Sequence, residues 1–332
     1  MNRRKIKLAA ACVMALPPVY LQAAEPEVTA PEVVQALEGT FGVHQGQRRN
    51  HIKGSCAIGE FVGTAEAAVY SRSLLFTGKV VPVIARFSLA GGNPKVPDAA
   101  RSARGMALQF KLPQGRLQQM SMLNTPMFGA SSPRTFLDLT LAQRPDPATG
   151  KPDPETLSAF KASHPDNHAQ AQYLASHNPP DSYTHSAFFG IHTFKFINAQ
   201  DKVTPVRWRF VPQEGEKSLS NEALKTAGAD FLEKALIDST AQKPARWDML
   251  VTIGQPGDPQ DDPTQPWPAQ RPEFKAGTLT ITSASPQKAS MCESINFDPM
   301  VMADGIAPTN DPVLRFRSQA YAVSFGKRLS GQ

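Results

Sequence analysis

Short runs of alternating apolar and polar residues recur along the chain from position 81 onward. Such alternation is typical of β-strands with one buried face. The segment 198–202, NAQDK, connects two of these runs and is typical of a hairpin turn. The predicted strands cover residues 81–89, 105–112, 117–123, 192–198, 203–211, 247–253 and 277–284.

Helical patterns interrupt the strands. Helices are predicted over residues 132–143, 154–164, 166–177 and 218–238. A final helix is better specified, because Asp311 can cap it, Pro312 fits its first turn and Gly326 can end it. The Pro- and Asp-rich stretch 254–273 is expected to be a surface loop. Many antiparallel strands with inserted helices predict a β-barrel in an α+β protein.

The N-terminus, MNRRKIKLAAACVMALPPVYLQAAEP, combines a basic start, a short apolar run and small residues near position 23. This pattern is typical of a secretory signal peptide, predicted here over residues 1–23. Its apolar part is shorter than the roughly 20 residues that a membrane span requires. We therefore expect a periplasmic or secreted protein without stable membrane insertion, folded as a single domain over residues 24–332.

Removal of this peptide changes both the charge and the cysteine count. Four basic residues and no acidic residue leave with it, so the formal net charge falls from +6 to about +2. Such a small charge argues against nucleic acid as a partner. Cys12 is also lost, which leaves Cys56 and Cys292 either free or joined in one disulfide, without the spacing of a metal site.

Arg317 and Tyr321 are four residues apart in the last predicted helix and therefore share one face. Most such pairs are packing or surface contacts. A phenol has a reference pKa of about 10, but a neighbouring guanidinium and a ferric haem both stabilise its phenolate form. Tyrosinate is a known axial ligand of haem iron. This hypothesis requires a group that handles peroxide on the other face of the haem.

His51 is the candidate for that group, although a lone histidine is more often structural. It stands in QRRNHIKGSCAIGEF, ahead of a glycine-punctuated loop that leads into a strand. The segments that follow in order are VPVIARFSLAGG, RSARGMALQF, NTPMFGASS, GIHTFKFINA and DPVLRFRSQAYAVSFGKRL. With them the chain resembles the haem catalase family, specifically its short exported branch, the catalase-related peroxidases. The resemblance covers most of residues 35–332 and is specific when HxKG and RxxxY occur together.

The resemblance implies roles for four residues around a buried haem b. His51 matches the distal base, and Ser88 matches the group that is hydrogen-bonded to it and fixes its tautomer. A neutral imidazole can accept a proton from one peroxide oxygen and return it to the other, so that water leaves. Tyr321 matches the proximal iron ligand, and Arg317 matches the residue that tunes it.

Five further residues match positions around the haem. Arg48, Arg86 and Arg328 match those that pair with the haem propionates, for which the bidentate guanidinium is well suited. Each arginine taken alone could equally be a solvated surface charge. Phe128 and Phe136 match the apolar flank of the haem on its distal side.

One departure from the family pattern bears on activity. Where full-length catalases read Gly-Asn-Asn-Thr-Pro, this chain reads MLNTP, so Leu123 replaces the distal asparagine and Asn124 remains. In catalases that asparagine helps to hold the second peroxide. The resemblance therefore implies that oxygen release from two peroxide molecules is impaired.

Other departures affect access and assembly. Asn50, Ala90 and Ser102 replace two valines and an aspartate of the access route, which implies a wider channel unless neighbouring side chains refill it. Only eleven residues follow Tyr321, and the parts that interlock the catalase tetramer are absent, so we expect a monomer or small homo-oligomer. The remaining histidines are interpreted as structural or surface residues: His44, His164, His168, His177, His185 and His192.

The resemblance thus predicts a haem peroxidase whose partners are hydrogen peroxide or an organic hydroperoxide and a small organic electron donor. A catalase-like barrel can also isomerise fatty-acid hydroperoxides, as allene oxide synthases do. A third alternative is a haem-binding stress protein without turnover. The isomerase needs no reductant, the peroxidase needs one, and the carrier consumes no hydroperoxide.

Overall fold

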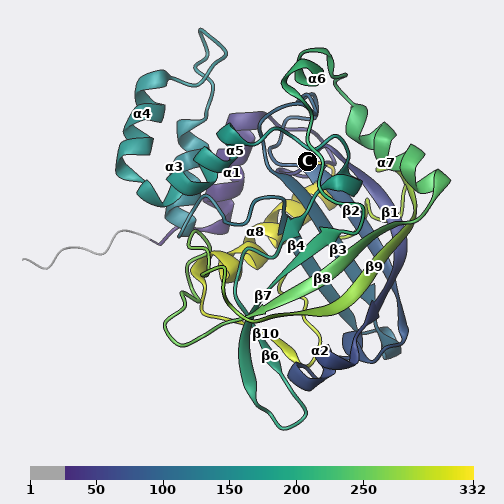
Figure 1. Ribbon diagram of the computed structural model, residues 1–332. Helices are drawn as coiled ribbons and strands as arrows, with labels where there is room; N and C mark the ends of the chain where they lie inside the picture. The colour runs from purple at the N-terminus through teal and green to yellow at the C-terminus, as the bar shows by residue number, and fades with distance from the viewer. Residues whose placement is uncertain (1–26) are drawn as a thin grey trace, which may run out of the picture.

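An antiparallel sheet of ten strands forms the centre of this computed structural model, which describes residues 27–332 (Figure 1). Its strands follow the order β10-β6-β7-β5-β4-β3-β2-β1-β9-β8, and β7 also pairs with β8. That pairing closes an eight-stranded barrel and leaves β6 and β10 as an extension. The predicted barrel is therefore confirmed. The strands are β1 (Gly54–Gly63), β2 (Val80–Leu89), β3 (Arg104–Lys111), β4 (Leu117–Leu123), β5 (Phe188–Phe189), β6 (Phe194–Ile197), β7 (Val203–Pro212), β8 (Ala245–Ile253), β9 (Glu273–Pro286) and β10 (Ile306–Pro308).

Helices occupy the links between strands and both ends of the described chain. Figure 1 shows α1, α3, α4 and α5 gathered on one side of the barrel. The α-helices are α1 (Ala30–Phe41), α2 (Ala65–Tyr70), α3 (Pro133–Ala142), α4 (Pro154–Ser163), α5 (His168–Ser176), α6 (Asn221–Thr226), α7 (Phe231–Gln242) and α8 (Pro312–Leu329). Short 3-10 turns are η1 (Leu74–Phe76), η2 (Pro113–Gly115), η3 (Pro165–Asn167) and η4 (Tyr183–His185). None of the helices within residues 27–332 has the length and apolar character needed to cross a membrane.

Apolar side chains fill the interior of the barrel. On β3, for example, Met106, Leu108 and Phe110 are completely buried, whereas the alternate residues face outward. Phe61 of β1 packs edge-to-face against Phe110, with ring centroids 5.4 Å apart. Burying each large side chain contributes about 1.5–3 kcal/mol. Because the interior is filled, the outer face of β2–β4 is the face available for a site.

The sheet register groups six outward-facing residues of β2, β3 and β4 in two rows. Ser88 pairs with Gly105, which pairs with Leu123. The second row consists of Arg86, Ala107 and Ser121. The period of two along each strand thus places polar and small residues, together with Leu123, on the outside of the barrel wall.

Helix α1 is not among the predicted elements. Thr29 and Glu32 form a capping box at its start, with the Thr29 amide donating to Glu32 Oε2 at 2.7 Å. Its apolar face packs against α3 and α8. The carboxylate of Glu38 bridges Arg49 and Lys327, which ties α1 to the loop before β1 and to the end of α8.

Two helix predictions were wrong in detail. The single helix predicted over 218–238 is divided into α6 and α7, because Ala227 is extended and Gly228 follows it, and glycine disfavours a helix interior by about 1 kcal/mol. Asp98 also accepts the Leu232 amide at 2.7 Å, which supports the separate start of α7. The final helix continues past Gly326 to Leu329, held in part by the Lys327–Glu38 ion pair.

Cys56 and Cys292 form a disulfide, with Cα atoms 5.6 Å apart. The bond ties β1 to the segment after β9.

Strand β5 and strand β10, with two and three residues, were not predicted because so short a segment carries no periodic pattern. The predicted signal peptide and Cys12 lie outside the described residues.

Candidate functional site

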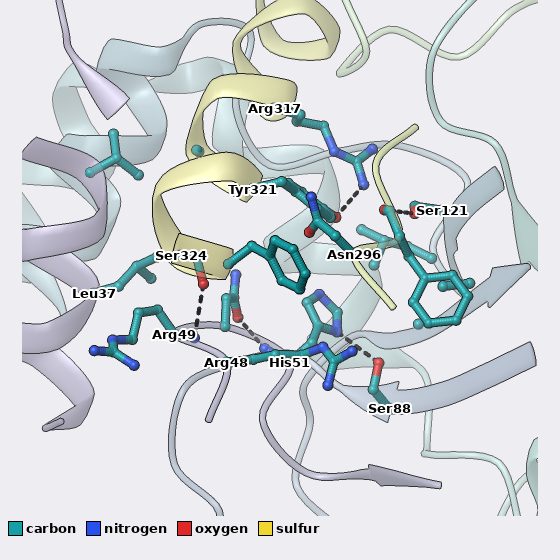
Figure 2. Close-up of a pocket in the computed structure, with 18 of the residues that line it drawn as sticks. Leu37, Arg48, Arg49, His51, Ser88, Ser121, Asn296, Arg317, Tyr321 and Ser324 are labelled. Atoms are coloured by element: carbon teal, nitrogen blue, oxygen red, sulfur yellow. Dashed lines mark hydrogen bonds between the residues drawn. The ribbon is translucent and has the colours of Figure 1, made fainter. Parts of the chain in front are cut away.

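A pocket lies between the outer face of β2–β4 and helix α8, with further walls from α1 and α3 (Figure 2). The lining includes all nine site residues predicted from the sequence: Arg48, His51, Arg86, Ser88, Phe128, Phe136, Arg317, Tyr321 and Arg328. In Figure 2 the Tyr321 phenol approaches from α8, whereas the His51 imidazole approaches from the loop before β1 on the opposite side.

His51 is held by a hydrogen bond of 3.0 Å between its Nδ1 and Ser88 Oγ. Gly105 lies opposite Ser88, and a Cβ there would stand 3.1 Å from Nδ1 and 2.9 Å from Oγ, so this pair requires glycine beside it. Desolvation in the pocket and the charges of Arg86, Arg317 and Arg48 lower the pKa of His51 to about 3. The imidazole is therefore neutral and can accept a proton.

Tyr321 belongs to a hydrogen-bonded chain that runs away from the pocket. Arg317 Nη2 donates to the Tyr321 hydroxyl at 2.9 Å, and Arg317 Nη1 lies 3.0 Å from His192 Nε2. His192 Nδ1 lies 2.6 Å from Asp311 Oδ2. Since a carboxylate only accepts, Nδ1 carries the proton and Nε2 accepts from Arg317. Burial lowers the pKa of His192, although Asp311 has the opposite effect. Because the pKa is lowered, the ring is neutral.

His192 and Asp311 were missed as functional residues. His192 was interpreted as structural, and Asp311 only as a helix cap. Asp311 does cap α8, because its Oδ1 accepts from the amides of Val313 and Leu314, but its second oxygen binds His192. No local pattern joins two residues that are 119 positions apart.

Three arginines gather at another part of the pocket. Arg48 Nη2 donates to the carbonyl of Ile295 at 2.8 Å, and Arg328 Nη1 donates to that of Glu293 at 2.9 Å. Arg86 Nη2 donates to the His51 carbonyl at 2.5 Å. Among residues 27–332, no carboxylate forms an ion pair with any of the three.

This cationic cluster favours an anion. Desolvation and then the charges of Arg86 and Arg328 lower the pKa of Arg48 to about 8. Desolvation, the largest cause, also lowers the pKa of Arg86 to about 10. Both effects arise because three like charges share a poorly solvated region, and the more distant charge of Glu293 offsets the effect on Arg48 only in part. Two carboxylates of a bound group would supply the missing negative charge.

The other walls of the pocket are apolar. Phe128 and Phe136 stack with centroids 5.9 Å apart. Helix α1 contributes Val33, Val34 and Leu37, which the sequence interpretation did not include. An apolar pocket with a phenol and an imidazole on opposite sides and cations nearby fits a haem, with its propionates toward the arginines.

The departures from the family pattern have different places in the structure. Leu123 lines the pocket and packs near Phe128. Asn124 Oδ1 accepts the Arg104 amide at 2.7 Å, so this oxygen is engaged with the backbone. Ala90 and Ser102 do not belong to the lining; Ser102 Oγ donates to the Ala90 carbonyl at 3.2 Å.

Comparisons with known proteins agree with this geometry. Residues 44–332 match the family model described as Catalase. The chain is 58% identical over 304 residues to a "Catalase-related peroxidase" of Synechococcus elongatus, covering 92% of this chain and 90% of that protein. It is 34% identical over 298 residues to a "Catalase-related peroxidase" of Mycolicibacterium paratuberculosis, covering 90% and 94%.

Longer relatives match over part of their length. A "Catalase" of Schizosaccharomyces pombe is 29% identical over 298 residues, which cover 85% of this chain and 58% of the relative. A solved "bacterial catalase" superposes with a TM-score of 0.79 at 27% identity, covering 86% of this chain and 58% of that one. The chain thus spans nearly the whole length of the two peroxidases but about three fifths of these catalases.

Proposed function

Because the chain belongs to the catalase family, we propose that it is a haem-dependent peroxidase that reduces hydrogen peroxide or organic hydroperoxides with electrons from a small organic donor. The observation that carries the proposal is the pair of His51 and Tyr321 on opposite sides of one pocket. Reduction of ROOH to ROH and water consumes two electrons and two protons, which oxidation of the donor supplies.

We propose haem b as the cofactor. When bound, haem would supply the redox chemistry for cleavage of the oxygen–oxygen bond and for oxidation of the donor. Tyr321 would be the iron ligand, and Arg48, Arg86 and Arg328 would bind the propionates. The Arg317 guanidinium donates a hydrogen bond of 2.9 Å to the phenol oxygen and thereby orients it.

His51 performs the proton transfer in this proposal. Its neutral ring accepts a proton from one peroxide oxygen and returns it to the departing one, so the leaving group is water or an alcohol instead of an anion. The hydrogen bond with Ser88 holds the ring during both transfers.

We propose that Leu123 suppresses oxygen release. It places an apolar side chain where an amide could hold a second peroxide, in the row that contains Ser88 and Gly105. The comparisons favour neither a hydroperoxide isomerase nor a non-catalytic haem carrier.

We also propose that the protein is exported and acts as a monomer or small homo-oligomer. The basic and apolar pattern of residues 1–23 supports export. The Cys56–Cys292 disulfide supports the same proposal, because such bonds persist in oxidising compartments.

The test is a panel of donors with purified, haem-loaded protein. Phenols and aromatic amines, hydrogen peroxide and a fatty-acid hydroperoxide are combined while donor oxidation, oxygen release and hydroperoxide loss are followed. We expect donor oxidation to exceed oxygen release. Vigorous oxygen release, or loss of lipid hydroperoxide without any donor, would contradict the peroxidase assignment.

A further inference from the structure

The side chain of Asn50 binds two backbone amides at the edge of the pocket. Its Oδ1 accepts from the His51 amide at 2.8 Å and from the Gly91 amide at 2.8 Å. Gly91 lies just beyond β2, the strand that carries Ser88. One side-chain oxygen therefore connects the loop that presents His51 to the strand that holds its imidazole.

The backbone of His51 needs this support. Its φ is +53°, in the left-handed region that costs a non-glycine residue about 1–2 kcal/mol. The surrounding contacts hold both sides of the residue: Asn50 accepts from its amide, and Arg86 Nη2 donates to its carbonyl at 2.5 Å. Such a conformation persists where neighbouring groups over-determine it.

We propose that Asn50 is a positioning residue for His51, and that its Oδ1, by accepting the His51 and Gly91 amides, holds the imidazole in the orientation that serves proton transfer to peroxide. This inference rests on the proposed peroxidase function for its consequence in catalysis. A positioning role differs from a role in widening an access channel. For channel width the size of the Asn50 side chain would matter, and its hydrogen-bond acceptor would not.

Two substitutions separate these roles. Asn50→Leu and Asn50→Asp both resemble asparagine in size, but only aspartate keeps an oxygen that can accept the two amides. Aspartate also adds a negative charge beside His51, which faces Arg48 on its own loop, Arg86 on β2, and Arg317 and Tyr321 on α8. The added charge raises the pKa of His51. The rate of reaction with peroxide should therefore begin to fall at a higher pH than in the wild type.

The first measurement is hydrogen exchange of the segments containing His51 and Gly91, on apoprotein and on haem-loaded protein. We expect Asn50→Leu to accelerate exchange of both amides at least about tenfold, and Asn50→Asp to keep them protected. The matched control is Asn198→Leu, because Asn198 Oδ1 also accepts two backbone amides, those of Gln200 and Lys202, in the β6–β7 hairpin. The control should leave the His51 and Gly91 amides unchanged.

The second measurement is the rate of reaction with peroxide as a function of pH. We expect Asn50→Leu to slow it by about 10–100-fold, a part of the 10²–10⁴ that positioned proton transfer contributes. Asn50→Asp should react at close to the wild-type rate when the pH is above the raised pKa of its His51. If the leucine variant does not fold, Asn50→Ala replaces it.

Some outcomes overturn the inference. Unchanged exchange of both amides in Asn50→Leu would show that Oδ1 does not hold the loop. Equal slowing by leucine and aspartate would show that an acceptor oxygen at position 50 does not preserve the reaction, which would overturn the inference. If the wild type fails to react with peroxide, the proposed function fails, while the exchange measurement still decides whether Asn50 positions His51.

Discussion

Arg317 and Tyr321 lie one turn apart on α8, and the arginine donates a hydrogen bond of 2.9 Å to the phenol oxygen. The other side of the guanidinium contacts His192, which is bound to Asp311 at the start of the same helix. Helix α8 thus carries the phenol, the cation beside it and the carboxylate that orients the connecting histidine. We expect His192 and Asp311, acting in series, to hold Arg317 in one orientation toward Tyr321.

Replacement of Tyr321 by Phe should remove the iron ligand. The haem-loaded wild type is expected to show a high-spin ferric spectrum typical of tyrosinate, and the variant should lose that spectrum and part of its haem. Tyr70→Phe is the control, because Tyr70 stacks on Phe274 outside the pocket. An unchanged spectrum and haem content in Tyr321→Phe would show that the ligand is another residue.

Replacement of His51 by Ala should leave haem bound and slow the reaction with hydrogen peroxide by about 10² to 10⁴, which is the usual contribution of a positioned acid–base group. Stopped-flow mixing measures this rate directly. His44→Ala is the control, since His44 contacts the Phe41 carbonyl and does not line the pocket. A loss of rate in the control together with none in His51→Ala would assign the base to His44.

Replacement of Leu123 by Asn should shift the ratio of oxygen release to donor oxidation toward oxygen. The expected gain is about tenfold, because one neutral hydrogen bond contributes about 0.5–1.5 kcal/mol and 1.4 kcal/mol is a factor of ten. Oxygen by electrode and donor oxidation by absorbance are measured at matched haem content. Leu37→Asn, which adds an amide to the α1 wall, is the control and should leave the ratio unchanged. An unchanged ratio in Leu123→Asn would show that Leu123 does not suppress oxygen release.

Replacement of Asp311 by Asn should destabilise the protein by about 1–3 kcal/mol. Asparagine has a single carbonyl oxygen, so it cannot serve both the helix amides and the His192 proton as the two carboxylate oxygens do. Denaturant unfolding of the apoprotein measures the change. Asp153→Asn is the control, because Asp153 caps the exposed start of α4 and asparagine caps equally well. Equal stability of both variants would contradict the double role of Asp311.

The stability of the apoprotein should fall as the pH decreases from about 6.5 to 5. His51 and His192 have folded-state pKa values below the unfolded value of about 6.5, so in this range the unfolded chain binds more protons than the folded chain. Each such histidine lowers the free energy of unfolding by up to about 1.4 kcal/mol per pH unit. His51→Gln should reduce this slope, as measured by urea unfolding at pH 7, 6 and 5. An unchanged slope would indicate that the fold does not lower the pKa of His51.

Several features of this protein were determined by the sequence alone. The period of two along residues 81–89, 105–112 and 117–123 predicted three strands, because alternation depends only on local backbone geometry. The spacing of Arg317 and Tyr321 placed them on one helix face for the same reason. The resemblance identified the nine residues that the fold brings into one pocket.

Tertiary structure decided the rest. Four features join segments that are far apart in the chain. They are the closure of the barrel by β7 and β8, the contact of His192 with Asp311, the disulfide, and the packing of α1 on α8. The role of Asn50 also belongs here, since its acceptor meets a residue 41 positions away. Local periodicity and capping carry information over a few residues, whereas these contacts depend on which faces the folded chain brings together.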